Sequence, residues 1–206
     1  MRRFAVRLAP MPNTILLFVK FPQPGRVKTR IAATVGADAA TAIYKELVAR
    51  VWAQLPAGAA ITVCYDPAER GEEVRAWLPG AARYEAQAAG DLGGRLRVAV
   101  GSAFANGAAK VAVIGSDCVE ITPAIFAETW ERLDHAEVVL GPTDDGGYYL
   151  IALRRPMPAL FENIRWSTEH TLSDTLAQAG AAPTHLLPKL RDVDTHEDWL
   201  AVGTAR

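Results

Sequence analysis

The sequence predicts a single-domain α/β protein with a mostly parallel sheet and helices on both of its faces. From Thr14 onward, short continuous apolar runs alternate with segments in which apolar residues recur at helical spacing. Continuous apolar runs are typical of parallel strands that are buried on both faces. The chain has 206 residues, half of them hydrophobic. This is enough for one sizeable core, and no linker indicates a second domain.

The first half of the chain alternates regularly between predicted strands and helices. Strands are expected at residues 15–19, 60–65, 83–86 and 110–115, and helices at 40–55, 69–78 and 93–107. In the first of these helices the apolar residues lie three or four positions apart, and Asp38 is available as an N-terminal cap. The order of strand, helix and strand is the order that builds a parallel sheet.

The second half continues this alternation and then loosens beyond Leu153. A helix is expected at 123–133, with proline in its first turn, and strands at 137–140 and 148–153. Helical segments at 160–164 and 171–179, a late strand at 186–190 and a final helix after Thr195 complete the prediction. Residues 1–13 are expected to be a flexible extension of a domain spanning 14–206, with Met11 as an alternative start to Met1.

Composition narrows the classes of function. The formal net charge of −1 argues against general binding of nucleic acid. No apolar run reaches the roughly 18 residues that a membrane span requires. Cys64 and Cys118 both belong to apolar runs, which fits a reducing compartment better than a disulfide framework. We therefore expect a cytoplasmic protein that acts on small molecules.

The first predicted strand runs into a loop that is rich in proline, glycine and positive charge. Two prolines and a glycine end the strand, and four cations lie within eleven positions: Lys20, Arg26, Lys28 and Arg30. Arginine forks and backbone N–H groups suit phosphate oxygens, although a solvated basic turn is the alternative. The loop is not of the Walker type, because Val27 stands where glycine should precede the Lys-Thr pair.

Acidic residues follow several later strands. Asp117 lies just after the 110–115 strand, Asp145 lies between the next two strands, and Asp192 and Asp194 follow the last one. The carboxyl ends of parallel strands form the ligand-binding edge of such a sheet. Carboxylates that face a basic loop there suggest a hard divalent cation such as Mg²⁺, shared with substrate phosphates.

Each of these residues also has a structural alternative. Asp117 could close a turn, Asp194 could cap the final helix, and Asp145-Gly146-Gly147 could be a plain hairpin turn. Trp166 and the Tyr148-Tyr149 pair could stack on a base or a sugar, but the core is the more common place for aromatic residues beside strands.

Six ordered blocks resemble a known family. They are Lys20–Arg30, Gln87 with 90–93, Gly115–Cys118, 140–151, Trp166–Thr168 and Asp192–Thr195. Over about residues 14–200 the chain is similar to small bacterial glycosyltransferase-like proteins, some of them assigned to arsenosugar biosynthesis. This family is placed in the nucleotide-diphospho-sugar transferase superfamily. The resemblance implies a Rossmann-like sheet of the glycosyltransferase A type.

The resemblance also implies roles for individual residues. Nucleotide and phosphate binding would fall to Lys20, Pro24, Gly25, Arg26, Lys28, Thr29, Arg30, Gln87, Gly90, Asp91 and Gly93. Contacts to the sugar or acceptor would come from Asp145, Gly146, Gly147, Trp166, Ser167 and Thr168. Asp117 would be the principal ligand of Mg²⁺ or Mn²⁺, completed by Asp192 or Asp194, and the catalytic residues would be Asp117, Asp145 and Lys28. The chain departs from the family at Val119, where proline is usual, and Ser116-Asp117-Cys118 is not a full D-x-D.

Three functions fit these features. The first is a metal-dependent transferase that uses a nucleotide-activated sugar and a small-molecule acceptor. The second is a nucleotidyltransferase, which joins an NTP to a phosphorylated acceptor and releases pyrophosphate. The third is a nucleotide-binding protein without turnover. Base, sugar, acceptor and oligomeric state are left open.

Overall fold

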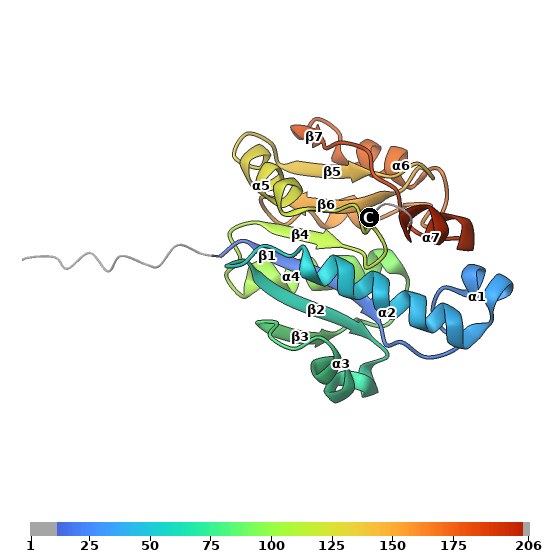
Figure 1. Ribbon diagram of the computed structural model, residues 1–206. Helices are drawn as coiled ribbons and strands as arrows, with labels where there is room; N and C mark the ends of the chain where they lie inside the picture. The colour runs from blue at the N-terminus through green and yellow to red at the C-terminus, as the bar shows by residue number, and fades with distance from the viewer. Residues whose placement is uncertain (1–11, 204–206) are drawn as a thin grey trace, which may run out of the picture.

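The computed structural model describes residues 12–203 and contains one mixed sheet with helices on both faces (Figure 1). The strands are β1 (Thr14–Lys20), β2 (Ala60–Asp66), β3 (Arg83–Ala86), β4 (Val111–Ile114), β5 (Val138–Pro142), β6 (Tyr148–Leu153) and β7 (Thr184–Leu186). The α-helices are α1 (Thr29–Val35), α2 (Ala37–Ala53), α3 (Gly71–Trp77), α4 (Leu92–Ala105), α5 (Pro123–Arg132), α6 (Thr171–Ala179) and α7 (His196–Gly203). Two 3₁₀ turns, η1 (Ala68–Arg70) and η2 (Pro158–Phe161), complete the chain.

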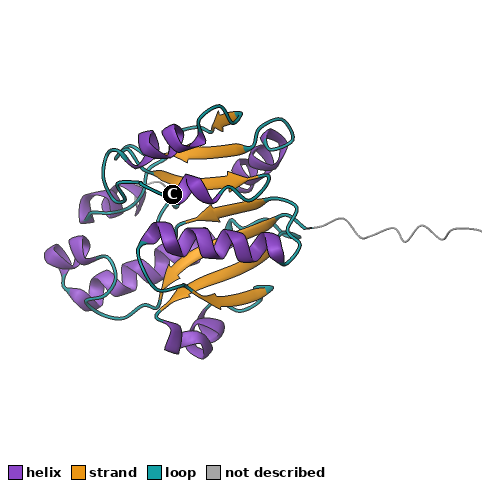
Figure 2. Cartoon of the chain, turned by 180° about the vertical axis from the view of Figure 1, so that it is seen from behind, coloured by secondary structure: helices purple, strands orange, loops and turns teal. Residues whose placement is uncertain are grey.

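The sheet is the middle of three layers, as its apolar strands predict. In β1, Ile15, Leu17 and Val19 pack into one core with side chains of α2, α3 and α5. The residue between the first two, Leu16, belongs to a second core with α4, η2 and α6. Successive side chains of a strand point to opposite faces, so both faces of β1 are buried. Figure 2, seen from behind, shows the helices of the second face.

The strand order is β3-β2-β1-β4-β6-β5-β7, and the mostly parallel sheet is confirmed. Only β6 runs against its neighbours: it pairs antiparallel with both β4 and β5. The chain moves outward from β1 to β2 and β3 and then returns to place β4 on the other side of β1. The carboxyl ends of β1 and β4 therefore flank a point at which the strand order reverses, which is where open α/β sheets bind ligands.

Four local predictions are corrected. The late strand lies at Thr184–Leu186 rather than 186–190, since Pro188 has no N–H to donate to a ladder. The segment expected to be helical at 160–164 is instead the 3₁₀ turn η2. Asp38 lies inside the first turn of α2, whose N-cap is Gly36. Helix α1 occupies residues that the sequence analysis assigned partly to the basic loop.

A third apolar cluster packs α7 and the segment before it against helices α1 and α2. Ile31 of α1 and Leu47 of α2 are fully buried together with Val193, and Trp199 of α7 packs against them. Burial of this cluster places the segment before α7 beside helix α1, and α7 lies next to α1 in Figure 1.

The start of the described chain is tied to the sheet. The expected extension, 1–13, lies outside the described residues except for Pro12 and Asn13, whose carbonyls accept backbone hydrogen bonds from Ala109 and Ala60. Within residues 12–203, no helix combines the length and the apolar character needed to cross a membrane.

Candidate functional site

The predicted site residues meet at the carboxyl edge of the sheet. Lys20 ends β1, and Asp117 follows β4 in the adjacent loop. The segment that carries Asp192 and Asp194 crosses this edge because the Val193 N–H donates to the Asp117 carbonyl at 3.1 Å. One backbone hydrogen bond thus brings together acids that are some 75 positions apart in the sequence.

Two adjoining cavities open at this edge, and Asp117 lines both of them. The larger, about 610 Å³, is named here the basic cavity. It is lined by cations from two segments of the chain, which are Lys20, Arg26, Lys28 and Arg30 of the segment that runs from β1 into α1, and Arg95 of α4. Its acids are Asp117 and Asp194. An excess of positive charge in a concave site favours a polyanionic ligand such as a nucleotide diphosphate.

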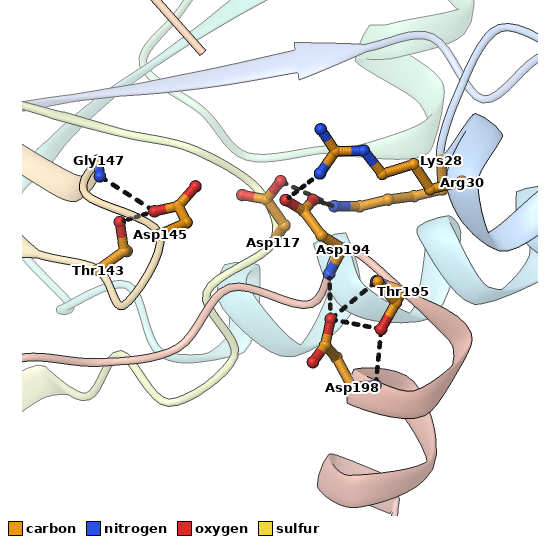
Figure 3. A network of polar contacts seen from close by, with 9 residues as sticks. All are labelled: Lys28, Arg30, Asp117, Thr143, Asp145, Gly147, Asp194, Thr195 and Asp198. Atoms are coloured by element: carbon orange, nitrogen blue, oxygen red, sulfur yellow. Dashed lines mark hydrogen bonds and ion pairs between the residues drawn. The ribbon is translucent and has the colours of Figure 1, made fainter. Parts of the chain in front are cut away.

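Lys28 is the most constrained of these cations. Its ammonium lies 2.9 Å from Oδ2 of Asp117 and 2.9 Å from Oδ1 of Asp194, and only 9% of its side chain is exposed. Arg30 contacts the other oxygen of Asp194 at 3.3 Å. Burial works to lower the pKa of Lys28, but the two carboxylates outweigh it and raise the pKa above its ordinary value. Figure 3 shows the lysine reaching toward both acids.

Gln87 and Arg95 form a second constrained pair in the basic cavity. The Gln87 amide donates to the carbonyls of Val19 and Cys64, at 3.1 and 2.9 Å, and accepts from Arg95 at 3.3 Å. Arg95 also donates to the Gly90 carbonyl at 3.0 Å. Gln87 therefore joins strands β1 and β2 and orients Arg95. Arg95 was not predicted from the sequence, although its place in the first turn after the Gly90–Gly93 block is a signal that identifies it.

The smaller cavity, about 300 Å³, is named here the acidic cavity. Asp117, Asp145 and Asp192 line it, and no Lys, Arg or His is among the described residues of its wall. The remaining wall is largely apolar and aromatic: Phe18, Leu96, Tyr148 and Trp166 contribute to it. The rings of Tyr148 and Trp166 meet edge to face, with centroids 6.4 Å apart. Such a combination of aromatic surface and carboxylates suits a ring that carries hydroxyl groups.

Asp145 is oriented by its own turn. Its Oδ1 accepts from the Thr143 hydroxyl and from the Gly147 N–H at 3.0 Å. Both hydrogen bonds of this carboxylate within residues 12–203 go to Oδ1 (Figure 3). The turn does connect the antiparallel strands β5 and β6, so the alternative of a hairpin turn was correct. That turn also places Asp145 in the wall of the acidic cavity.

Asp192 is partly buried and lies near the other acids of the site. Burial, and then the charges of Asp117, Asp145 and Asp194, raise the pKa of Asp192 to about 8. Its Oδ1 is buried and has no hydrogen-bond partner in the described part of the chain. A carboxylate oxygen in such a position lacks a compensating positive charge or donor.

The donor set suits a hard divalent cation. Carboxylate oxygens are the protein ligands that Mg²⁺ and Mn²⁺ prefer, and Mg²⁺ commonly takes one or two of them together with substrate phosphates. The unpartnered oxygen of Asp192 beside Asp117 fits this chemistry. As the side chains stand, residues 12–203 contain no cluster of three or more His, Cys, Asp or Glu residues that could hold a metal ion. The ammonium of Lys28 lies between Asp117 and Asp194 instead.

Most of the predicted ligand-binding residues line one of the cavities, and five do not. Thr29 and Gly90 lie in the basic cavity, Gly147 and Thr168 in the acidic cavity, and Ser167 in both. The walls of the two cavities do not include Pro24, Gly25, Asp91, Gly93 or Gly146.

For three of these five residues, the structure shows what role they have outside the cavity walls. Asp91 caps α4, because its carboxylate accepts from the Gly94 N–H at 2.8 Å. Gly93 is buried where an added Cβ would lie 2.8 Å from Nε1 of Trp166 and would also meet the Phe161 carbonyl. Gly146 has φ +84° and lies against the backbone of Glu169.

The final helix begins in a way that leaves Asp194 available to the basic cavity. The Thr195 hydroxyl accepts from the Asp198 N–H at 3.1 Å, and the Asp198 carboxylate accepts from the Thr195 N–H at 2.8 Å. This reciprocal pair is a capping box. Capping by Asp194 is therefore not needed, and its carboxylate contacts Lys28 and Arg30 (Figure 3).

The aromatic residues belong both to the core and to the site. Tyr149 is buried in the first core, as expected of an aromatic residue beside a strand, and it also lines the acidic cavity. Trp166 packs against the second core and also lines the acidic cavity. Tyr44, an apolar position of the segment expected to be helical at 40–55, also reaches the site from α2. Its hydroxyl accepts from the Lys20 N–H at 2.9 Å and lies 3.4 Å from the Ser116 hydroxyl, at the base of the basic cavity.

The chain is similar to known proteins both in sequence and in structure. A sequence model of the family described as "Uncharacterized protein conserved in bacteria (DUF2064)" matches residues 50–168. No curated protein matches the chain. Among solved structures, a "putative nucleotide-diphospho-sugar transferase" from Desulfovibrio desulfuricans G20 is 33% identical, with a TM-score of 0.89 over 95% of this chain and 87% of the other.

More distant structures share the fold. A manganese complex of Rv0371c from Mycobacterium tuberculosis H37Rv is 18% identical, with a TM-score of 0.57 over 93% of this chain and 97% of the other. A CMP:2-keto-3-deoxy-manno-octonic acid synthetase complexed with CTP is 13% identical, with a TM-score of 0.59 over 95% of this chain and 100% of the other. These two likenesses show the fold that the chain shares with both proteins.

Proposed function

The chain belongs to the bacterial family DUF2064, and we propose that it is a divalent-metal-dependent glycosyltransferase whose donor is a nucleotide-activated sugar. The nucleotide diphosphate would occupy the basic cavity and the sugar would occupy the acidic cavity. The similar protein from Desulfovibrio desulfuricans G20, by the name it carries, supports a nucleotide-diphospho-sugar substrate.

The observation that carries this proposal is the division of charge between the two cavities. The basic cavity holds five cations, Lys20, Arg26, Lys28, Arg30 and Arg95, and the acidic cavity holds none among the described residues. A diphosphate is stabilised on the basic side and repelled on the acidic side, whereas an uncharged sugar ring can stack on Trp166 and donate hydroxyl hydrogens to carboxylates. Asp117, which lines both cavities, stands where the phosphate would join the sugar.

Each side chain of the site would have a role in the transfer. The acceptor oxygen would attack the anomeric carbon, the bond from that carbon to the phosphate oxygen would break, and the nucleoside diphosphate would leave with the electron pair. Asp145 would take the proton of the acceptor hydroxyl, because its hydrogen bonds to the described residues go to Oδ1 and leave Oδ2 for a ligand. Arg26, Arg30 and Arg95 would neutralise the leaving diphosphate. A divalent cation bound by Asp117 with Asp192 or Asp194 would add positive charge at the same phosphates.

A nucleotidyltransferase is the second candidate, and the basic loop favours it. In that reaction an acceptor phosphate attacks the α-phosphorus of an NTP and pyrophosphate leaves. The fold shared with a synthetase complexed with CTP is compatible with this chemistry. The acidic cavity disfavours it, since a phosphorylated acceptor would face Asp117, Asp145 and Asp192 with no Lys or Arg from the described wall.

A turnover and thermal-shift panel tests the proposal. NTPs and UDP-, GDP-, CDP- and ADP-sugars are each combined with Mg²⁺ or Mn²⁺. We expect one class of nucleotide sugar to stabilise the protein and to release its nucleoside diphosphate when an acceptor is supplied. Release of pyrophosphate from an NTP would instead identify a nucleotidyltransferase. Stabilisation without turnover would leave a nucleotide-binding protein, and the absence of any shift at millimolar nucleotide would contradict the shared premise.

A further inference from the structure

Lys28 occupies the space between Asp117 and Asp194, one of the two carboxylate pairs to which the proposed function assigns a divalent cation. Its ammonium is 2.9 Å from one oxygen of Asp117 and 2.9 Å from one oxygen of Asp194. Its side chain is 9% exposed, while those of Asp117 and Asp194 are 33% and 39% exposed. The lysine is thus the buried member of the trio and supplies the positive charge between two acids.

The backbone holds the lysine in this position from a conformation that L-residues seldom adopt. Lys28 has φ 45° and ψ 51°, the left-handed region, and helix α1 begins at the next residue. That conformation costs roughly 1 kcal/mol or more in a residue other than glycine. The loop accepts this cost at the residue whose side chain bridges Asp117 and Asp194.

An ammonium and a divalent cation compete for these two oxygens. Mg²⁺ binds carboxylate oxygens at about 2.0–2.1 Å, so a cation held by the same oxygens as the ammonium would lie within contact distance of it. Two positive charges at such a distance repel strongly outside bulk water. The lysine must therefore withdraw before the two oxygens that it contacts, Oδ2 of Asp117 and Oδ1 of Asp194, can coordinate a metal ion together.

The basic cavity offers the lysine another partner. Lys28 lines this cavity with Lys20 and Arg26, so a phosphate bound among them comes within reach of a flexible four-carbon side chain. The phosphate would compensate the ammonium as it leaves the carboxylates. Binding of phosphate would then release the acids to the metal ion, and by linkage the metal ion would favour binding of the phosphate.

We propose that the Lys28 ammonium acts as a placeholder, which means that it occupies the position of the divalent cation between Asp117 and Asp194. The ammonium leaves the two carboxylates only when a nucleotide phosphate binds it instead. The inference rests on the proposed use of metal and nucleotide. It predicts that metal and nucleotide enter the site together, and that metal alone binds weakly because it must displace a bound ammonium.

Binding of Mn²⁺ without nucleotide tests this inference, read from the electron paramagnetic resonance signal of free Mn²⁺. We expect Lys28→Met to bind Mn²⁺ at least about tenfold more tightly than the wild type, because the competing cation is gone. Lys28→Gln, which keeps a polar side chain, should behave in the same way and serves if the methionine variant folds poorly. Lys20→Met is the matched control: it removes one positive charge from the same cavity, from a residue that forms no ion pair with Asp117 or Asp194 in the described part of the chain.

The outcomes separate the inference from the proposed function. If Lys28→Met and Lys20→Met tighten Mn²⁺ binding equally, the effect is one of general charge and the placeholder is refuted. If Lys28→Met binds Mn²⁺ no better than the wild type, the placeholder is refuted while metal use stands. If no variant binds Mn²⁺ at about 10 mM, with or without nucleotide, both the placeholder and the metal dependence of the proposed function fail.

Discussion

At the scale of the residue, Asp145 is the side chain on which the proposed transfer depends most directly. Asp145→Asn keeps the shape of the turn but removes the base, so we expect turnover of the nucleotide sugar to fall about 10²- to 10⁴-fold. Nucleotide affinity should remain unchanged, since the basic cavity is lined without Asp145. Steady-state kinetics and calorimetry measure the two effects.

Asp144→Asn is the control for this prediction. Asp144 is the neighbouring acid, 59% exposed, and it pairs with Lys189 rather than with the cavity wall. Its loss removes the same charge from the same turn and should leave turnover within about twofold of the wild type, because exposed ion pairs contribute little. Equal losses in the two variants would show that charge in the turn, and not the position of Asp145, matters.

At the scale of the element, helix α4 packs closely against Phe161 and Trp166 at Gly93. Gly93→Ala places a Cβ against the Phe161 carbonyl and the Trp166 indole, so we expect a loss of about 1–3 kcal/mol in the free energy of unfolding. Gly101→Ala lies in the same helix with open space around it and should gain about 0.5–1 kcal/mol from helix propensity. Urea unfolding of both variants measures the contrast. A stable Gly93→Ala variant would contradict the close packing.

An ion pair between Arg165 and Asp174 holds the loop before α6 against that helix. The backbone N–H of Arg165 and its guanidinium donate to both oxygens of Asp174, at 2.7–3.0 Å. These hydrogen bonds lower the pKa of Asp174 to about 2. A carboxyl whose pKa is lowered in the folded state stabilises that state above its unfolded pKa of about 3.9. The contribution is then lost as the pH falls through about 2.

This ion pair predicts how the loop responds to acid. Amide exchange of residues 165–168, which include Trp166 of the acidic cavity, should be slow at pH 5 and faster near pH 2 relative to the rest of the fold. In Asp174→Asn the same amides should exchange fast at both pH values. Equal protection in the wild type and in the variant at pH 5 would show that the ion pair does not hold the loop.

The elements show what the sequence can and cannot predict. Strand β3 and helix α6 were predicted at their observed limits, and Gly180 directly follows α6, as is common at the end of a helix. The reversed direction of β6 was not predicted, since a strand buried on both faces reads as the same apolar run in either direction.

In the candidate site, too, the residues could be predicted from the sequence but the contacts between them could not. The residues of the basic loop and the acids were predicted from their places after strands. Sequence position could not reveal that Lys28 contacts Asp117 and Asp194 or that Gln87 orients Arg95. Those contacts depend on backbone bonds between distant segments, such as that from Val193 to Asp117.

At the scale of the whole molecule, a chain with a net charge of −1 gathers five cations in one cavity. We therefore expect its affinity for pyrophosphate, a probe without base or sugar, to fall several-fold as salt rises from about 0.05 to 0.5 M, since screening weakens partly exposed charges. Arg95→Gln should lower both the affinity and its dependence on salt. Arg75→Gln, a cation stacked on Tyr84 outside the cavity, should change neither. Calorimetric titrations at several salt concentrations make the comparison. Equal behaviour of the two arginine variants would mean that the molecule attracts phosphate through its general surface charge rather than through the cavity.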